Sequence, residues 1–360
     1  MSYLFEYLIF LAEAVTIVVA LLIVISAIAS VSLRPRGEGA HGHLRVGKIN
    51  DQLRSLRYAM EATLLPAGAV KKQHKQEAKA ESQAQKALAS ELKTKKKTDP
   101  DKDKDKDKDA DADGRRRIFV INFEGDVKAS NVDHLRLEVS AILTMANDTD
   151  AVVICLESPG GMVHSYGLAA SQLTRIRNKG IPLTAVVDMV AASGGYLMAA
   201  VANRIIAAPF ALVGSIGVVA QIPNVYRLLK KHDIDVEVLT AGKYKRTMTV
   251  LGENTDEARE KFIAELEDVH ALFQEFVADN RPGLDLDTVA TGEAWYGKRA
   301  LALGLVDELA TSDEYLMSLC EEHDVYSVTW VEHKKPIDRL LGKVNMLLDQ
   351  AGSALDMWRK

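Results

Sequence analysis

The sequence predicts a largely parallel α/β domain that follows a membrane-spanning segment and a charged linker. From residue 117 onward, short apolar runs alternate with amphipathic stretches, and glycine-rich turns separate them. This alternation is typical of βα units that build a parallel sheet. We therefore divide the chain into a transmembrane anchor, a flexible charged linker, a globular domain and a C-terminal amphipathic helix, at 1–33, 34–116, 117–331 and 332–360.

Residues 14–33 form the first predicted element. They are apolar apart from Thr and Ser, and they are long enough to span a bilayer as a helix. A cleaved signal peptide is the alternative, because the small residues 27–29 fit a cleavage site. Against cleavage, residues 1–7 contain no Lys or Arg and include Glu6, whereas a signal peptide begins with positive charge. We therefore expect an uncleaved anchor.

The predicted linker, 34–116, is poor in residues that could build a core. Residues 71–97 are rich in Lys, Gln, Ala and Glu, and residues 99–113 repeat Asp, Lys and Ala. Such a composition favours a solvated tether. The tether ends at the three arginines 115–117, just before the first convincing strand.

The globular domain is expected to alternate strands and helices. Strands are predicted over 118–123, 151–156 and 183–187, and a further strand begins at Val236. Helices are predicted over 130–145, 166–177, 196–201, 225–231, 257–279 and 315–322. Apolar residues then recur at three- and four-residue steps from Ile337 to Trp358, which predicts an amphipathic helix packed on its own or a neighbouring subunit.

The composition excludes several classes of function. The formal net charge of -5 gives no basic footprint for nucleic acid. The two cysteines, Cys155 and Cys320, have no Cys or His neighbour at ligand spacing, so we expect no disulfide framework and no metal site. No phosphate-binding Gly-x-x-x-x-Gly-Lys-Ser/Thr loop occurs between residues 117 and 313. We therefore expect no metal and no cofactor.

Ser193 is the candidate nucleophile. It stands between the apolar run 183–187 and the helical stretch 196–201, and Gly194 and Gly195 follow it. Small neighbours permit a sharp turn that exposes the hydroxyl, and the start of a helix offers unpaired backbone amides. A serine and two glycines at a strand end also occur in ordinary turns, so the partners of Ser193 decide its role.

A glycine turn upstream is the candidate oxyanion hole. Residues 154–161 are predicted to form a buried strand that ends in the turn Ser158-Pro159-Gly160-Gly161. The N–H groups of such a turn can point into a cavity because no side chain covers them. We expect the amides of Gly161 and Gly194 to provide two donors for the oxyanion.

A lysine is the candidate general base. Lys243 and Lys245 follow a predicted strand, and a lysine made neutral by desolvation can take a proton from a serine. Histidines are less suggestive. His164 follows the glycine turn, while His232 and His270 lie in charged helical stretches.

Taken together, these segments resemble the signal peptide peptidase A family of membrane-bound serine peptidases, and most closely its SohB-type branch. The resemblance covers residues 117 to 313 or so. It rests on four motifs in order: Ser-Pro-Gly-Gly at 158–161, Ala-Ala-Ser-Gly-Gly-Tyr at 191–196, Val-Gly-Ser-Ile-Gly-Val at 213–218 and Gly-x-x-Lys at 242–245.

The resemblance implies a Ser-Lys dyad. Lys245 follows Ser193 by 52 positions, the separation found in that family, so it is selected over Lys243. The resemblance also implies that Ser215 hydrogen-bonds the lysine amine and that the fold is the spiral of ββα units shared by ClpP-like and crotonase-like enzymes. It further implies a homo-oligomer, in which adjacent subunits sometimes contribute catalytic parts.

Two arguments about the membrane face disagree. The basic residues Arg34, Arg36, Arg45 and Lys48 place the domain in the cytoplasm by the positive-inside rule. The resemblance implies the bacterial inner membrane with the catalytic domain on the periplasmic side, where signal peptides and translocated proteins occur. Long domains translocate despite nearby charge, so the orientation stays open.

Two other functions compete with a peptidase. A crotonase-like acyl-CoA enzyme shares the glycine turn but uses a carboxylate, and Ser193 occupies the place where that carboxylate is needed. A catalytically dead membrane scaffold has no need of both Ser193 and Lys245 at the family's separation. We therefore expect a membrane-anchored serine endopeptidase that acts through an acyl-enzyme on peptides or translocated proteins.

Overall fold

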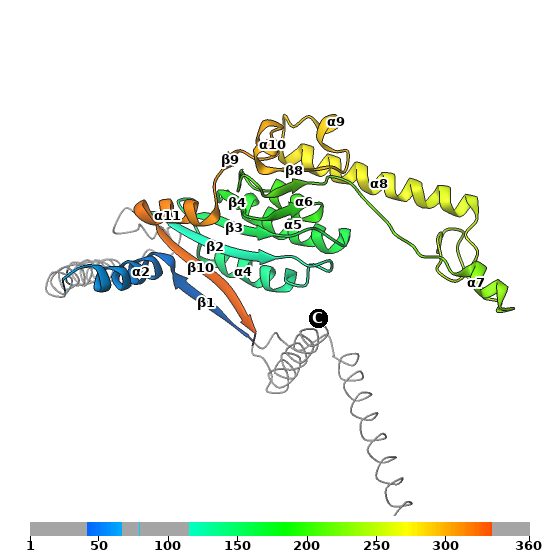
Figure 1. The fold of residues 1–360 in the computed structure, drawn as a ribbon, viewed down its shortest axis with the longest axis horizontal. Coiled ribbons are helices and arrows are strands. Elements are labelled where there is room, and N and C mark those ends of the chain that lie inside the picture. The colour runs from blue at the N-terminus through cyan, green and yellow to red at the C-terminus, as the bar shows by residue number, and fades with distance from the viewer. Residues whose placement is uncertain (1–41, 67–78, 80–114, 333–360) are drawn as a thin grey trace, which may run out of the picture. The chain divides into compact units, whose positions relative to one another are not determined.

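The computed structural model describes residues 42–66, 79 and 115–332 (Figure 1). Within these ranges, Leu44–Val331 form one compact unit. The predicted anchor and the predicted C-terminal helix lie outside the described residues, as does most of the predicted linker. Among the helices of the described ranges, none combines the length and the apolar character needed to cross a membrane.

A seven-stranded sheet forms the centre of this unit, in the order β1-β10-β2-β3-β4-β6-β9. From β10 to β9, every pair of neighbouring strands is parallel. The predicted α/β fold is thereby confirmed. The strands are β1 Gly42–Lys48, β2 Arg117–Glu124, β3 Ala151–Glu157, β4 Leu183–Val187, β6 Arg204–Ala207, β9 Glu308–Leu309 and β10 Asp324–Glu332.

A second, three-stranded sheet carries the segment that leads to Ser193. β5 (Val190–Ala192) pairs in parallel with β7 (Leu212–Gly214), and β7 pairs in antiparallel fashion with β8 (Ala294–Tyr296). An isolated parallel bridge joins Ser158 to Ala191. The residue after β3 is therefore tied to β5, which brings the two predicted glycine turns together.

The helices of the described residues are α2 Ile49–Leu64, α4 Val132–Met145, α5 Val163–Asn178, α6 Gly194–Ala200, α7 Tyr226–Lys231, α8 Asp256–Asn280, α9 Leu286–Val289, α10 Gly297–Ala302 and α11 Ser312–Glu322. Six helices, α4, α5, α6, α7, α8 and α11, begin and end within a few residues of the predicted positions, whereas α2, α9 and α10 were not predicted.

Alternation along β2 explains why helices cover both faces of the large sheet. Ile118 and Val120 belong to one apolar cluster, which includes α11. Phe119 and Ile121 belong to the other cluster, which includes α4, α5 and α6. Successive side chains of a strand point to opposite faces, so a continuous apolar run is the pattern of a strand buried on both sides.

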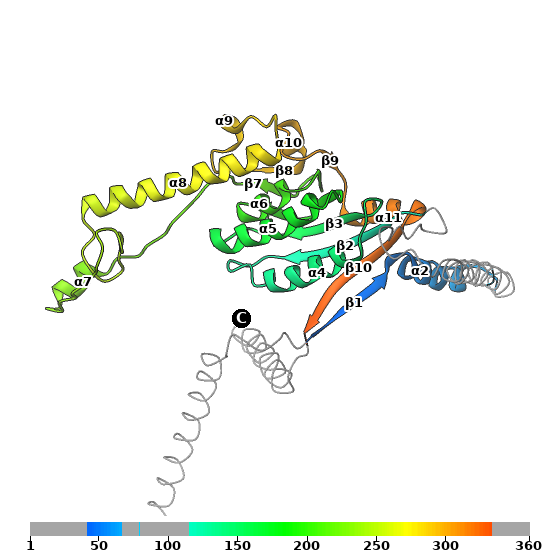
Figure 2. The ribbon, with the colours of Figure 1, turned by 180° about the vertical axis from the view of Figure 1, so that it is seen from behind.

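An arm, residues 218–255, extends from the sheets and returns through α8 (Figures 1 and 2). α8 runs over 25 residues, yet within it only Val277 is buried. α7 has no buried residue, and residues 232–255 contain neither helix nor strand. The strand predicted to begin at Val236 is therefore wrong, because no neighbouring strand pairs with its apolar residues.

Residues 42–64 correct the predicted linker, because they form β1 and α2. The Asn50 side chain donates to the carbonyls of Cys320 and His323, at 3.0 and 2.9 Å, and accepts from the Val325 amide at 2.9 Å. Lys48 also pairs with Asp324 at 3.0 Å. The prediction failed here because partners distant in sequence hold these residues, which lack a strong apolar pattern of their own.

Asp307 joins α8 to the main sheet. Its carboxylate accepts from Arg281 at 2.7 and 2.8 Å and from the Ile205 amide at 2.7 Å. Burial alone would raise the Asp307 pKa, but these hydrogen bonds outweigh it and hold the pKa below its usual value. An acid with a lowered pKa stabilises the fold above its unfolded-state pKa, and this contribution is lost as the pH falls through the folded-state pKa.

We expect Asp307→Asn to lower the free energy of unfolding by about 2 kcal/mol at neutral pH, and the difference from the unsubstituted chain to shrink below roughly pH 4. Asp235→Asn is the matched control, because it removes an exposed pair with Lys230 and should change stability little. Urea unfolding of the full chain in detergent at several pH values measures both. Equal losses of unfolding free energy in the two variants would contradict a stabilising role for the Asp307 hydrogen bonds.

Candidate active site

Ser193 stands at a strained turn between β5 and α6. Its φ of 51° lies in the left-handed region, which is uncommon for a residue other than glycine. Its amide donates to the Gly214 carbonyl at 2.8 Å, and its side chain caps no amide of α6. The turn therefore holds the serine backbone firmly while its hydroxyl makes no capping contact with the helix.

The glycines behind Ser193 are required by close packing. A Cβ on Gly194 would lie 2.4 Å from Cγ of Tyr166, and a Cβ on Gly195 would lie 2.5 Å from the Ser158 carbonyl oxygen. Both distances are too short for a real contact. The Gly-Gly pair thus lets α6 begin directly against α5 and the end of β3.

The glycine turn at 158–161 lies against Ser193. Gly160 has a φ of 86°, and a Cβ placed on it would lie 2.8 Å from the Ser193 Cβ and 2.7 Å from the Gly194 nitrogen. Within the described residues, neither the Gly161 nor the Gly194 amide donates a hydrogen bond. Two unpaired amides beside a serine are what an oxyanion hole needs.

The Glu157 carboxylate fixes the loop that leads to Ser193. It accepts from three consecutive amides, those of Asp188, Met189 and Val190, each at 2.9 Å. The Ser158 amide donates to the Val190 carbonyl at 2.8 Å, and the Ala192 amide donates to the Ser158 carbonyl at 3.0 Å. The backbone on both sides of the candidate nucleophile is therefore bonded to the end of β3.

A backbone hydrogen bond places Ser215 near Ser193. It follows Gly214, whose carbonyl accepts from the Ser193 amide, and its own amide donates to Glu293 at 2.6 Å. Its φ of 53° is again left-handed, and its hydroxyl donates to the Gly292 carbonyl at 3.3 Å. Ser215 is thus placed beside the turn, with its hydroxyl on a backbone carbonyl rather than on a lysine.

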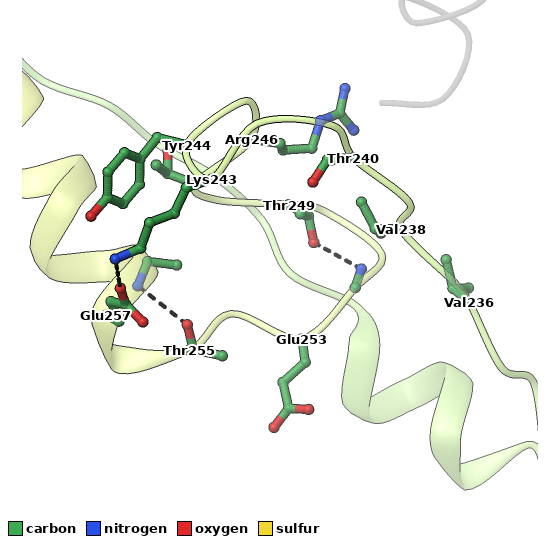
Figure 3. A pocket seen from close by; sticks show the side chains of 13 residues that line it. Val236, Val238, Thr240, Lys243, Tyr244, Arg246, Thr249, Glu253, Thr255 and Glu257 are labelled. Carbon is green, nitrogen blue, oxygen red and sulfur yellow. Dashed lines mark hydrogen bonds and ion pairs between the residues drawn. The ribbon is translucent and has the colours of Figure 1, made fainter.

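Lys243 is held by an ion pair at the tip of the arm (Figure 3). Its Nζ lies 2.9 Å from Glu257 Oε1 and 4.9 Å from the centre of the Tyr244 ring. Hydrogen bonding to Tyr244 and Glu257 raises the pKa of Lys243 above its usual value. A lysine with a raised pKa is a poor general base at neutral pH.

Lys245 is exposed and stays on the arm. The cavity that it lines is formed by residues 236–252 alone. The arm tip is bonded to Glu257, near the start of α8, whereas His270 of the same helix contacts the Ile216 carbonyl at 3.2 Å. The helical rise between these two residues is about 20 Å. Within one chain, the structure does not bring Lys245 to Ser193.

Three features of the site were not found from the sequence: the carboxylate of Glu157, the contact of His270 with Ile216, and a buried pair formed by Ser158 and Tyr166. Glu157 and Ser158 lie at the 158–161 motif, which could have drawn attention to them, whereas His270 contacts a residue 54 positions away and gives no such signal. Cys155, expected to be an inert core residue, is partly buried, and burial raises the pKa of its thiol to about 12. In the described ranges, no three His, Cys, Asp or Glu side chains gather as metal ligands.

Fold and site together define an α/β protein that presents a serine on a strand-to-helix turn next to unpaired amides. The family models give the same result more specifically. The model of the peptidase family S49 N-terminal region matches residues 2–173, and the peptidase family S49 model matches residues 175–326. The chain belongs to peptidase family S49, and the family expected from its motifs is confirmed.

Curated relatives of this chain include several SohB proteins. A probable protease SohB of Haemophilus influenzae is 57% identical over 226 residues, which make up 63% of this chain and 64% of that protein. A probable protease SohB of Buchnera aphidicola subsp. Acyrthosiphon pisum is 50% identical over 236 residues, 66% of this chain and 70% of the relative. The matched part of this chain thus spans about two thirds of each relative.

A solved structure, that of the 1510-N membrane-bound stomatin-specific protease, is 16% identical to this chain. The match covers 57% of this chain and 84% of that one, with a TM-score of 0.36.

Gly161 offers a test of the turn. A Cβ there would lie 2.1 Å from the Val127 carbonyl oxygen, so we expect Gly161→Ala to displace the turn and destabilise the fold by about 1–3 kcal/mol. Gly167→Ala in α5 is the control, because nothing lies within 4 Å of its added Cβ and alanine favours a helix by up to about 1 kcal/mol. Thermal unfolding compares the two. A Gly161→Ala variant as stable as Gly167→Ala would contradict the packing.

Proposed function

We propose that this chain is a serine endopeptidase with Ser193 as its nucleophile and Lys245 as its general base. The observation that carries the proposal is the strained Ser193 turn packed against Gly160, with the amides of Gly161 and Gly194 unpaired beside it. Family membership supports the class of reaction, since the relatives are described as proteases. The proposed substrates are peptides and membrane-associated or translocated proteins.

The proposed reaction has two halves. Neutral Lys245 takes the proton from the Ser193 hydroxyl, and the oxygen attacks the peptide carbonyl carbon. The amides of Gly161 and Gly194 hold the resulting oxyanion. When the intermediate collapses, the C–N bond breaks and the lysine gives its proton to the leaving amine. Water then attacks the acyl-enzyme by the same route and releases the acid and Ser193.

We propose that the dyad forms between chains of a homo-oligomer. The arm carries Lys245 away from the Ser193 of its own chain, and its apolar residues are uncovered: Val219 is 91% exposed and Leu239 is 88% exposed. We propose that a partner chain covers them, since exposed apolar patches mark contacts between proteins. A neighbouring chain that covers the arm would also desolvate Lys245, which favours its neutral form.

The competing functions fit less well. A crotonase-like acyl-CoA enzyme would share the proposed ββα spiral and the glycine turn, but Ser193 with its strained backbone has no role in that chemistry. A catalytically dead scaffold would not require that strain, which costs about 1–3 kcal/mol. We further propose residues 14–33 as an anchor in the bacterial inner membrane, with the catalytic domain on the periplasmic side.

Substitutions at the proposed dyad test the mechanism. Ser193→Ala and Lys245→Ala should each lower kcat by about 10³-fold or more, because each removes a partner of the covalent step. Lys245→Arg should be equally inactive, because a guanidinium stays charged. Lys243→Ala, the matched control, should keep most of the activity. Peptide hydrolysis by the full chain in detergent measures all four, and turnover retained in Ser193→Ala would refute the proposal.

Mixing of inactive chains tests where the base comes from. In oligomers assembled from equal amounts of Ser193→Ala and Lys245→Ala chains, one site in four should combine an intact serine with an intact lysine from its neighbour. We therefore expect about a quarter of the unsubstituted activity to return if the two residues meet across a head-to-tail interface. Each variant alone stays inactive. Mixed oligomers that form but show no activity would place the lysine within its own chain.

A further inference from the structure

Two buried hydroxyl groups lie beneath the glycine turns and take no part in the proposed reaction. Ser158 and Tyr166 are both 0% exposed, and their hydroxyl oxygens are 2.5 Å apart. A Cβ on Gly125 would lie 2.4 Å from each of these oxygens, so Gly125 packs directly over the pair. Buried polar groups are costly unless every one of them is hydrogen-bonded. The direction of each bond in this group can therefore be worked out.

The hydrogen bonds run in one direction from the glycine turn to the loop after β2. Tyr166 Oη lies 2.7 Å from the Asp126 carbonyl oxygen, which only accepts, so the tyrosine proton is used there. Ser158 must then donate its proton to the Tyr166 oxygen. The Gly160 amide in turn donates to Ser158 Oγ at 3.1 Å. Each of these hydrogens has an acceptor: Gly160 donates to Ser158, Ser158 donates to Tyr166, and Tyr166 donates to the Asp126 carbonyl.

The residues on both sides of Gly161 are held by this chain of bonds or by the loop at its end. On one side, the preceding amide, that of Gly160, is held by Ser158. On the other side, the following amide, that of Met162, donates to the Val127 carbonyl at 2.8 Å. Tyr166 holds the neighbouring Asp126 carbonyl and so fixes the loop that carries Val127. The orientation of the Gly161 N–H is therefore set between two bonded amides.

Tyr166 also touches the other proposed donor. Its ring lies so close to Gly194 that a Cβ there would be 2.4 Å from the ring carbon Cγ. Burial raises the pKa of Tyr166 above its usual value, so the hydroxyl keeps its proton at neutral and moderately alkaline pH. One side chain thus contacts the backbone of both glycine turns and remains a hydrogen-bond donor.

We propose that Ser158 and Tyr166 are positioning residues that aim the Gly161 and Gly194 amides at the developing oxyanion. The proposal rests on the serine peptidase function proposed above. Tyr166 acts through Ser158 and through the loop that carries Asp126 and Val127, and neither side chain touches the reacting atoms. Donors aimed in advance stabilise a transition state far more than the ground state, so the loss should fall on kcat rather than on KM.

Tyr196 supplies a matched control. It is also 0% exposed, and its hydroxyl donates to a backbone carbonyl, that of Leu305, at 3.0 Å. Tyr196→Phe therefore removes a buried tyrosine hydrogen bond of the same kind as Tyr166→Phe does. A merely structural role predicts that the two variants lose stability and activity alike.

The experiment measures kcat, KM and Ser193 labelling by a fluorophosphonate probe for the full chain and four variants. We expect Tyr166→Phe to lower kcat and the labelling rate about tenfold with KM within roughly twofold, and Ser158→Ala to lower both rates about 100-fold. Tyr196→Phe should keep both rates within about twofold. The losses in the double variant Ser158→Ala/Tyr166→Phe should be less than multiplicative, since the two hydroxyls belong to one chain of hydrogen bonds.

Equal activity losses in Tyr166→Phe and Tyr196→Phe, or fully multiplicative losses in the double variant, would overturn the proposal. Hydrogen exchange of the segment 158–162 provides a readout that needs no turnover. Tyr166→Phe should speed exchange there, and Tyr196→Phe should not. If the unsubstituted chain shows no Ser193-dependent hydrolysis, the peptidase function fails, and unchanged exchange in Tyr166→Phe would separately refute the positioning role.

Discussion

The contact between two backbone turns is the constraint on which the site depends. The turn at 158–161 ends β3, and the turn at 192–195 ends β5. They approach so closely that a Cβ on Gly160 would collide with the backbone of Ala192 and Gly194. Because the strands before them are tied together at Ser158 and Ala191, the approach is set by the sheets and not by the loops.

This close approach leaves no space for a Cβ at the glycines, and the buried polar groups beneath the turns hydrogen-bond to one another and to the backbone. The Glu157 carboxylate, the Ser158 hydroxyl and the Tyr166 hydroxyl do so with backbone amides and carbonyls. A buried network in which every hydrogen has an acceptor is rigid, because any movement leaves a polar group unpaired. Rigidity of this kind allows Ser193 to keep a φ of 51°.

The arm has the opposite character. It has no apolar core of its own, and its tip is held to α8 mainly by surface contacts such as the pair of Lys243 with Glu257. Exposed ion pairs contribute little to stability. The two residues of the proposed dyad therefore differ in support. Ser193 stands on a compact turn that is ordered within its own chain, whereas the arm that carries Lys245 would have to be ordered by a neighbouring chain.

The sequence by itself determined the α/β class, the positions of six helices and of strands β2, β3 and β4, and the glycine turns around Ser193. These follow from local causes: apolar runs of strand length, helical periodicity, and glycines where a Cβ has no room. The sequence could not reveal that β1 and α2 belong to the fold, because residues such as Asn50 are held by partners more than 200 positions away. The sequence also predicted a strand at Val236. No strand forms there, because an apolar run needs a neighbouring strand to pair with.

Only the tertiary structure decided the partners of Lys243 and the direction of the buried hydroxyl bonds. Lys243 and Lys245 are alike in local sequence, yet it is Lys243 that pairs with Glu257 and lies by the Tyr244 ring, and these contacts raise its pKa. Nothing in the local sequence marks Ser158 and Tyr166. The fold buries them beside the Asp126 carbonyl, which can only accept, and this fixes the direction of their hydrogen bonds. Burial and charge depend on every neighbour in space, so a linear pattern does not specify them.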